Sequence, residues 1–302
     1  MTETDIEALL RQVPGWERSQ ITVAPLHGGI TNTNFVARID GEPRVVRVPG
    51  ERTELLGIDR ANEAEAALRA AALGIGPAVI ATLPEIGTLI TALVPGGHLD
   101  PEPFTQRLAQ VVELLHTFHD SGPLDGAFPI HRVVEWHARD AVAQGGTLPA
   151  AYERLHTQSE RIEAAFATAP MPMAPCHNDL LPGNVLFEDA GRAWLLDFEY
   201  AGMNDRFFDL GNLSVNCGLD AAADEELLRL YFGGSSPSRW ARLQLMKMMS
   251  EFREGMWAVV QQAISTLDTD FVTYANERLG NCEHLAAQPQ FEQWLADAAL
   301  PV

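Results

Sequence analysis

Polar residues with the spacing of a phosphoryl-transfer site lie between residues 176 and 212. His177-Asn-Asp179 is followed by Asn184, which gives the pattern H-x-D-x-x-x-x-N. A carboxylate at Asp179 can orient a hydroxyl group and accept its proton while a phosphoryl group is transferred. An amide oxygen and a carboxylate oxygen suit Mg²⁺ when phosphate oxygens and water complete its shell. The pattern predicts Asp179 as catalytic base, and Asn184 with Asp197 as ligands of Mg²⁺.

Two short apolar runs would position these side chains. Residues 185–187 and 193–196 have the length of strands, and the glycine-containing segment 188–192 between them is typical of a hairpin loop. In a hairpin, Asn184 enters the first strand and Asp197 leaves the second, so both lie at one edge and can share a cation. The alternative is an ordinary hairpin whose carboxylates belong to turns and have no catalytic role. This alternative is disfavoured because Asp179, Asn184 and Asp197 seldom occur in this order and spacing by chance.

The N-terminal part predicts a strand–turn–strand–turn–strand unit over residues 21–26, 35–39 and 44–48. Between the first two strands lies a segment with adjacent glycines, Gly28 and Gly29. Glycine allows close approach of the backbone, so amide N–H groups there could surround phosphate oxygens, although such a pair is also common in plain turns.

Arg47 on the third of these strands carries a planar, permanently charged group that suits phosphate oxygens. The alternative is an arginine on the solvent face of the strand. Arg44 lies on the same strand and has the weaker claim to a functional position.

The remaining pattern predicts helices around two further strands. A short helix over residues 4–13, capped by Thr4 or Asp5, precedes the first strand. The strands are expected at 79–82 and 88–93, and the longer helices at 58–73, 104–119, 133–143, 150–167, 227–232, 239–264 and 270–276.

Composition limits the classes of partner and compartment. The chain has 302 residues, of which 46% are hydrophobic, and a net charge of −20, so nucleic acid or an anionic membrane is a poor partner. Three cysteines, an acidic N-terminus without a signal-peptide pattern and the lack of a long apolar run predict a cytoplasmic protein without disulfides. His116 and His119 are expected to be structural, because no third metal ligand is near in sequence.

The segment around Asp197 carries a family resemblance. His-Asn-Asp in place of His-Arg-Asp, and Asp197-Phe-Glu-Tyr-Ala-Gly-Met-Asn204 followed by Arg206 and Phe208-Asp-Leu-Gly-Asn212, resemble the choline/ethanolamine kinases. These belong to the wider aminoglycoside-phosphotransferase-like kinases. The resemblance implies an α+β, two-lobed protein-kinase-like fold with a small antiparallel-sheet N-lobe, residues 1–95, and a mostly helical C-lobe, residues 96–302.

The resemblance also implies a nucleotide site for ATP. The run Gly-Gly-x-Thr-Asn-x-x-Phe resembles the family's nucleotide loop, and Arg47 occupies the family's phosphate-contacting position. Counting back from Gly76-Pro77 places Glu63, rather than Glu65, as the partner of Arg47. The implied nucleotide-binding residues are Gly28, Gly29, Thr31, Asn32, Asn34, Arg47, Glu63 and, through hinge backbone groups, Ala92 and Leu93.

For the acceptor, the resemblance implies aromatic rings and carboxylates around a cation. The residues expected to line this site are Glu199, Tyr200, Glu254, Trp257 and Tyr274. The chain departs from the animal choline kinases at Glu254, where those enzymes have tryptophan, and at Asn216, where they have an acidic residue. An incomplete aromatic cage leaves the identity of the acceptor open, while Asp209 is expected to brace the catalytic loop.

We therefore predict an ATP- and Mg²⁺-dependent kinase for the hydroxyl group of a small, cationic amino alcohol, choline or ethanolamine. Two alternatives remain: a kinase for an aminoglycoside, thiamine or a sugar, and a nucleotide-binding pseudokinase with a regulatory role. The joint presence of Asp179, Asn184 and Asp197 counts against the pseudokinase. The oligomeric state does not follow from the sequence.

Overall fold

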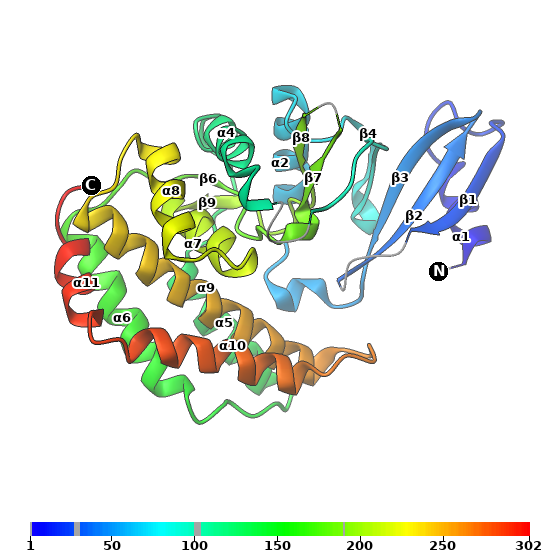
Figure 1. Ribbon diagram of the computed structural model, residues 1–302. Coiled ribbons are helices and arrows are strands. Elements are labelled where there is room, and N and C mark those ends of the chain that lie inside the picture. The colour runs from blue at the N-terminus through cyan, green and yellow to red at the C-terminus, as the bar shows by residue number, and fades with distance from the viewer. Residues whose placement is uncertain (1, 27–30, 100–103, 190) are drawn as a thin grey trace.

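The computed structural model describes residues 2–26, 31–99, 104–189 and 191–302 (Figure 1). Its N-terminal part is a five-stranded antiparallel sheet in the order β1-β2-β3-β5-β4. The strands are β1 (Ile21–Leu26), β2 (Asn32–Ile39), β3 (Glu42–Pro49), β4 (Val79–Leu83) and β5 (Thr88–Ala92). The expected α+β fold with an antiparallel N-terminal sheet is confirmed.

One face of this sheet packs against the first helix, α1 (Glu3–Leu10). Alternate residues of β2, such as Phe35 and Ala37, point into this small core, where Ile6 of α1 meets them. The helix starts earlier than expected, because Thr2 is its N-cap: the Thr2 hydroxyl accepts from the Asp5 N–H, and the Asp5 carboxylate accepts from the Thr2 N–H. The expected cap at Thr4 or Asp5 is therefore wrong.

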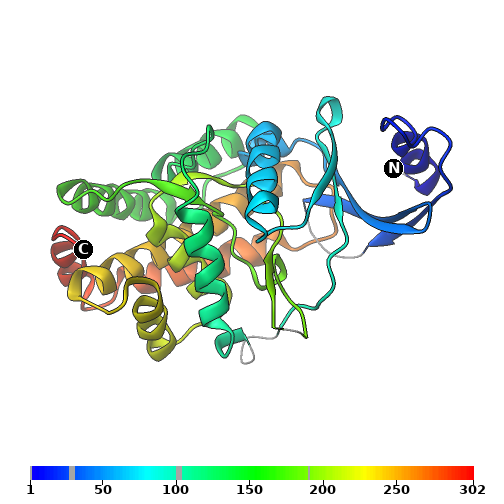
Figure 2. The same ribbon diagram turned by 90° about the horizontal axis from the view of Figure 1, so that it is seen from above.

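Helix α2 (Arg60–Leu73) lies between the sheet and the helical part of the molecule (Figure 2). Asp59 caps its N-terminus, and Gly74 ends it in the left-handed conformation at φ +72°. Among the residues that α2 buries is one carboxylate, Glu63, which is 3% exposed. A buried carboxylate requires a partner, and the position of α2 brings that partner from β3.

The rest of the chain is mostly helical, arranged around the 28-residue helix α9 (Pro237–Ile264). Because α7, α10, α5 and α11 all pack against α9, its middle is buried on every side. The other helices are α4 (Leu108–His119), α5 (Ile130–Ala143), α6 (Tyr152–Thr168), α7 (Arg206–Asn216), α8 (Ala221–Phe232), α10 (Phe271–Ala286) and α11 (Phe291–Ala298). Short 3₁₀ turns are η1 (Thr53–Leu56), η2 (Pro84–Ile86) and η3 (Pro182–Asn184).

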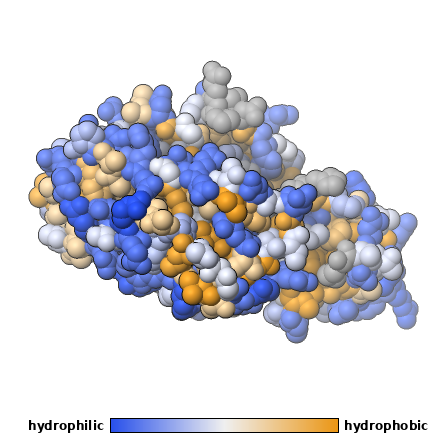
Figure 3. All heavy atoms as spheres, turned by 90° about the horizontal axis from the view of Figure 1, so that it is seen from below, coloured by the Kyte–Doolittle hydropathy of each residue, from blue (hydrophilic) through white to orange (hydrophobic). Residues whose placement is uncertain are grey.

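The surface carries hydrophilic residues among scattered hydrophobic ones on the face seen in Figure 3. Of the helices that the structure describes, none combines the length and the apolar character needed to cross a bilayer.

Two small antiparallel pairs hold the catalytic segment. The predicted hairpin is confirmed as β7 (Val185–Phe187) with β8 (Ala193–Leu195), and β6 (Ala174–Cys176) pairs with β9 (Gly202–Asn204). The Leu196 N–H donates to the Asn184 carbonyl at 2.9 Å, so the expected common edge for Asn184 and Asp197 is formed.

The segment that leaves β5 is attached to the hairpin. Gly97 and Phe187 exchange two backbone hydrogen bonds, of 3.0 and 2.9 Å. Gly96 has φ +128°, and a Cβ atom there would lie 2.2 Å from the Leu186 side chain and 2.5 Å from the Phe187 carbonyl oxygen. Only glycine allows the chain to pass this close to β7.

Candidate active site

A cavity of about 790 Å³ lies where the sheet, α2, the β7–β8 hairpin and α9 meet. All the predicted site residues that the structure describes line it: Thr31, Asn32, Asn34, Arg47, Glu63, Ala92, Leu93, Asp179, Asn184, Asp197, Glu199, Tyr200, Glu254, Trp257 and Tyr274. Gly28 and Gly29 lie outside the described residues.

Asp179 is a buried carboxylate with two side-chain partners. Its Oδ1 accepts from Arg253 at 3.1 Å, and its Oδ2 accepts from the Asn184 amide at 3.3 Å. The same Asn184 amide nitrogen donates to the Asp179 carbonyl at 2.8 Å. Burial raises the pKa of Asp179, and Arg253 acts in the opposite direction. Asp179 also lines the cavity. A carboxylate that has a raised pKa and reaches the cavity is suited to accept a proton from a group bound there.

The backbone beside these groups is strained at two positions. Asn178 has φ +64° and Asp197 has φ +60°, a region that residues other than glycine rarely adopt. Asn178 is held there by its side chain, which donates to the Tyr200 carbonyl at 3.0 Å and accepts from Asn204 at 2.8 Å. The His177 side chain fixes the segment between β8 and Asp197, since its Nε2 bonds to the Leu196 carbonyl oxygen at 2.8 Å. Such strain commonly marks a functional loop.

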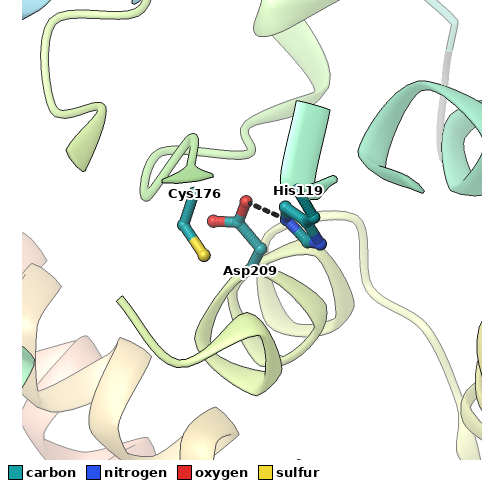
Figure 4. A group of neighbouring side chains, drawn as sticks. All are labelled: His119, Cys176 and Asp209. Atoms are coloured by element: carbon teal, nitrogen blue, oxygen red, sulfur yellow. Dashed lines mark hydrogen bonds and ion pairs between the residues drawn. The ribbon is translucent and has the colours of Figure 1, made fainter. Parts of the chain in front are cut away.

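Asp209 of α7 braces the loop from behind, as expected. Its two carboxylate oxygens accept from the backbone N–H groups of His177 and Asn178, each at 2.7 Å. One of these oxygens also bonds to His119 Nε2 at 2.9 Å, the contact drawn in Figure 4. Every member of this cluster is buried, so the carboxylate acts by fixing backbone rather than by touching the cavity.

The neighbourhood of Asp209 has the residue types of a metal site, because Cys176 and His119 flank it (Figure 4). However, His119 Nδ1 is already bonded to the Tyr231 hydroxyl at 2.6 Å, and burial raises the pKa of the Cys176 thiol. A protonated thiol is a poor metal ligand. His116 stacks on the Tyr231 ring at 4.1 Å, which agrees with a structural histidine pair.

Arg47 and Glu63 form the expected ion pair across the β3–α2 interface. Arg47 also lies 3.4 Å from Asp197, so it connects α2 with the edge of the hairpin. Glu65 points elsewhere and pairs with Arg69 at 3.0 Å. Arg44 lies on the opposite face of β3 and is 3.8 Å from Glu42. As predicted, Arg47 pairs with Glu63, while Arg44 and Glu65 have other partners.

A second arginine, which lies behind the lining residues at this end of the cavity, was missed. Arg60 lies 2.8 Å from Glu63 and 3.5 Å from Glu199, and it donates to the Asn32 amide oxygen at 3.3 Å. Its spacing of three residues from Glu63 on one helix is a signal that sequence alone offers. Glu199 accepts from Asn32 at 2.8 Å and lies 3.5 Å from Arg47, so its partners belong to the predicted nucleotide site and not to the acceptor site.

The other end of the cavity combines rings and charges. The Trp257 indole donates to the Tyr200 hydroxyl at 3.0 Å, and the Tyr274 hydroxyl donates to Glu254 at 3.0 Å. Arg253 was also missed; it pairs with Glu254 and lies 4.1 Å above the Tyr200 ring. An adjacent arginine and glutamate, followed by the apolar run Gly255–Val260, is the sequence signal for such a buried pair.

The predicted hinge has one backbone group already engaged. The Ala92 N–H donates to the Ala78 carbonyl at 2.8 Å. Ala92 and Leu93, which follow each other in sequence, both line the cavity.

We expect Arg47→Ala to lower kcat/KM for ATP by about 10²-fold, since it removes a fixed positive charge and leaves Glu63 and Asp197 without it. Initial rates at varied ATP concentration measure the effect. Arg44→Ala on the same strand is the matched control and should change kcat/KM less than about twofold. Equal losses in both variants would contradict the assignment of Arg47.

The chain is similar to known proteins over most of its length. Residues 22–245 match the family model described as "Phosphotransferase enzyme family". The chain is 28% identical to ethanolamine kinase 2 of Mus musculus over 315 residues, which covers 93% of this chain and 80% of the mouse protein.

Solved structures show the same likeness. A choline/ethanolamine kinase family protein from Mesorhizobium loti is 33% identical, with a TM-score of 0.83 and 99% coverage of both chains. The structure of LicA in complex with AMP has a TM-score of 0.76 at 22% identity, covering 94% of this chain and 97% of LicA, and so shares the fold.

Proposed function

Because the chain belongs to the phosphotransferase enzyme family and, within it, to the choline/ethanolamine kinase family, we propose that it transfers the γ-phosphoryl group of ATP to the hydroxyl group of a small amino alcohol, ethanolamine or choline. The chain is a phosphotransferase that uses a nucleotide, and the resemblance read from the catalytic segment is confirmed. The observation that supports the acceptor is one cavity lined by Arg47, by the Asp179 carboxylate, and by the aromatic rings and carboxylate of Trp257, Tyr274 and Glu254.

In this proposal the nucleotide occupies the end of the cavity formed by the sheet and α2. Phosphate oxygens lie near Arg47. Glu63, which also pairs with Arg60, orients the Arg47 side chain. The adenine ring lies against Ala92 and Leu93. These residues line the same cavity as Thr31, Asn32 and Asn34, which follow the glycines of the predicted nucleotide loop.

The residues present fit Mg²⁺. The Asn184 nitrogen is used by the Asp179 carbonyl, which leaves the amide oxygen of Asn184 available as a ligand. Asp197 adds a carboxylate at the same edge, and a set of hard oxygen donors is what this ion prefers. When bound, Mg²⁺ neutralises charge on the transferring phosphoryl group.

Asp179 performs the proton transfer in this mechanism. The acceptor hydroxyl hydrogen-bonds to the Asp179 carboxylate, its oxygen forms the new bond to the γ-phosphorus, and the bond to the ADP oxygen breaks. The hydroxyl proton passes to Asp179. Arg253 and Asn184 hold the carboxylate toward the cavity during the step.

The proposal extends to organisation and setting. We place the boundary between a nucleotide-binding lobe, residues 1–95, and a helical lobe, residues 96–302, just after β5. The three cysteines are free and buried, which supports a cytoplasmic setting.

The first test is ADP release with ATP and Mg²⁺ against ethanolamine, choline, thiamine, sugars and aminoglycosides. We expect turnover with an amino alcohol and only background with the others. Turnover with a sugar or an aminoglycoside alone would overturn the proposed acceptor while leaving the phosphotransferase. ATP binding without turnover on any acceptor would favour a pseudokinase.

A further inference from the structure

The acceptor end of the cavity already contains a cation from the chain itself. Arg253 is 2% exposed, and its guanidinium lies 4.1 Å from the centre of the Tyr200 ring. A second arginine, Arg278, lies 5.1 Å from the centre of the Tyr274 ring. One face of each tyrosine is therefore occupied by an arginine, at distances typical of cation–π contacts.

The charges at this end do not balance. Arg253 lies 3.1 Å from Asp179 and also pairs with Glu254, so two carboxylates share one guanidinium. Arg278 is paired with Glu251 at 3.3 Å, so these two charges cancel. With Asp179, Glu254 and Arg253 all in their ionised forms, two negative charges and one positive charge leave one negative charge beside the cavity. All three side chains are nearly buried, so a charge of this kind favours a ligand that brings one positive charge.

Glu254 can offer a hydrogen-bond acceptor to that ligand. One of its oxygens faces Arg253 and the other accepts from the Tyr274 hydroxyl at 3.0 Å. An ionised carboxylate has about four lone-pair sites, so both oxygens retain acceptor capacity. A primary ammonium group carries three N–H donors, whereas a trimethylammonium group has none and depends on open aromatic faces.

On the basis of the proposed function, we propose that Arg253 and Glu254 select an acceptor with a primary ammonium group and disfavour a trimethylammonium group. Arg253 occupies one face of Tyr200, which is then closed to a methylated cation. Glu254 binds the N–H donors that only a less methylated amine has. Arg253 thus determines specificity and also positions Asp179.

The unmodified protein provides the first test. Ethanolamine, its N-methyl and N,N-dimethyl derivatives, and choline differ only in methyl groups on nitrogen. We expect kcat/KM to fall along this series, with choline at least about tenfold below ethanolamine. Equal or higher kcat/KM for choline would overturn the selection while leaving the proposed function intact. Absence of turnover with all four amines would instead overturn the proposed function.

A variant provides the second test. Arg253→Met removes the guanidinium and uncovers Tyr200, so the ratio of kcat/KM for choline to that for ethanolamine should rise at least about tenfold. The ratio within one enzyme cancels any loss caused by a displaced Asp179. An unchanged ratio in a folded Arg253→Met protein would contradict the role of Arg253. If this variant does not fold, the methylation series decides alone.

The matched control is Arg242→Met. Arg242 is also buried in α9 and lies 4.4 Å from an aromatic ring, that of Phe166, but it does not line the cavity. Its replacement should lower stability without changing the choline-to-ethanolamine ratio. A similar shift of the ratio in this control would show that loss of any buried arginine of α9 loosens the pocket, and would overturn the assignment to Arg253.

Discussion

Replacement of Asp179 by asparagine should lower kcat by about 10²- to 10⁴-fold, the range attributed to a well-placed general base. Asparagine has the same size and can still contact Asn184, but it cannot take up the hydroxyl proton. Arg253 would keep Glu254 as its remaining partner, so we expect the fold to persist. ADP release under saturating ATP and acceptor measures the loss, and calorimetric titration with ATP should show nearly unchanged affinity.

Asp189→Asn is the control for this change, because Asp189 is an exposed carboxylate in the loop between β7 and β8. We expect its kcat to stay within about twofold of the parent value. If Asp179→Asn turned over at the parent rate, Asp179 would not be the base. A loss of ATP affinity equal to the loss of kcat would mean that the substitution acts on nucleotide binding.

Replacement of Asp209 by asparagine should reduce the free energy of unfolding by about 3 kcal/mol and also reduce kcat. The two oxygens of Asp209 accept from two backbone N–H groups and from His119. An amide nitrogen in place of one oxygen would face a donor, so a buried N–H would lose its partner. Urea denaturation measures the stability, and kcat reports whether the loop beside Asp179 has moved.

The matched control is Asp224→Asn. Asp224 is also a buried carboxylate, 1% exposed, and it binds Lys247 at 2.6 Å and Ser214 at 2.5 Å without touching the loop. It should show a comparable loss of stability with kcat within about twofold. A fall of kcat in both variants would indicate that lower stability alone reduces turnover, contrary to a specific role for Asp209.

The parts of the site predicted from sequence are those that depend on local order. The hairpin that brings Asn184 and Asp197 to one edge follows from two apolar runs and a glycine-containing loop. The pair of Arg47 with Glu63 was found only because the family resemblance fixed the count along α2. Periodicity placed most of the helices but missed α11 (Phe291–Ala298). It did not fix the helix ends, as at Thr2, where a side-chain cap sets the boundary.

The parts that were missed depend on contacts between distant segments. Arg253 meets Asp179 across 74 positions of the chain, and no local pattern encodes that approach. Glu199 follows Phe198 in the catalytic segment, yet Asn32 and Arg60 draw it toward the nucleotide loop. Tertiary packing decides such pairings, because a buried charge takes whichever opposite charge the fold brings near.

The attachment of Gly97 to Phe187 limits how the molecule can open to exchange nucleotide. Between Ala92, held by Ala78, and Gly97, only residues 93–96 can act as a pivot on this linker, and Pro95 within them has a fixed φ. We expect a short tilt of the sheet rather than a wide swing. The β7–β8 hairpin is hydrogen-bonded to Gly97, which follows the pivot. We therefore expect the hairpin edge with Asn184 and Asp197 to stay fixed relative to Gly97 when the sheet tilts.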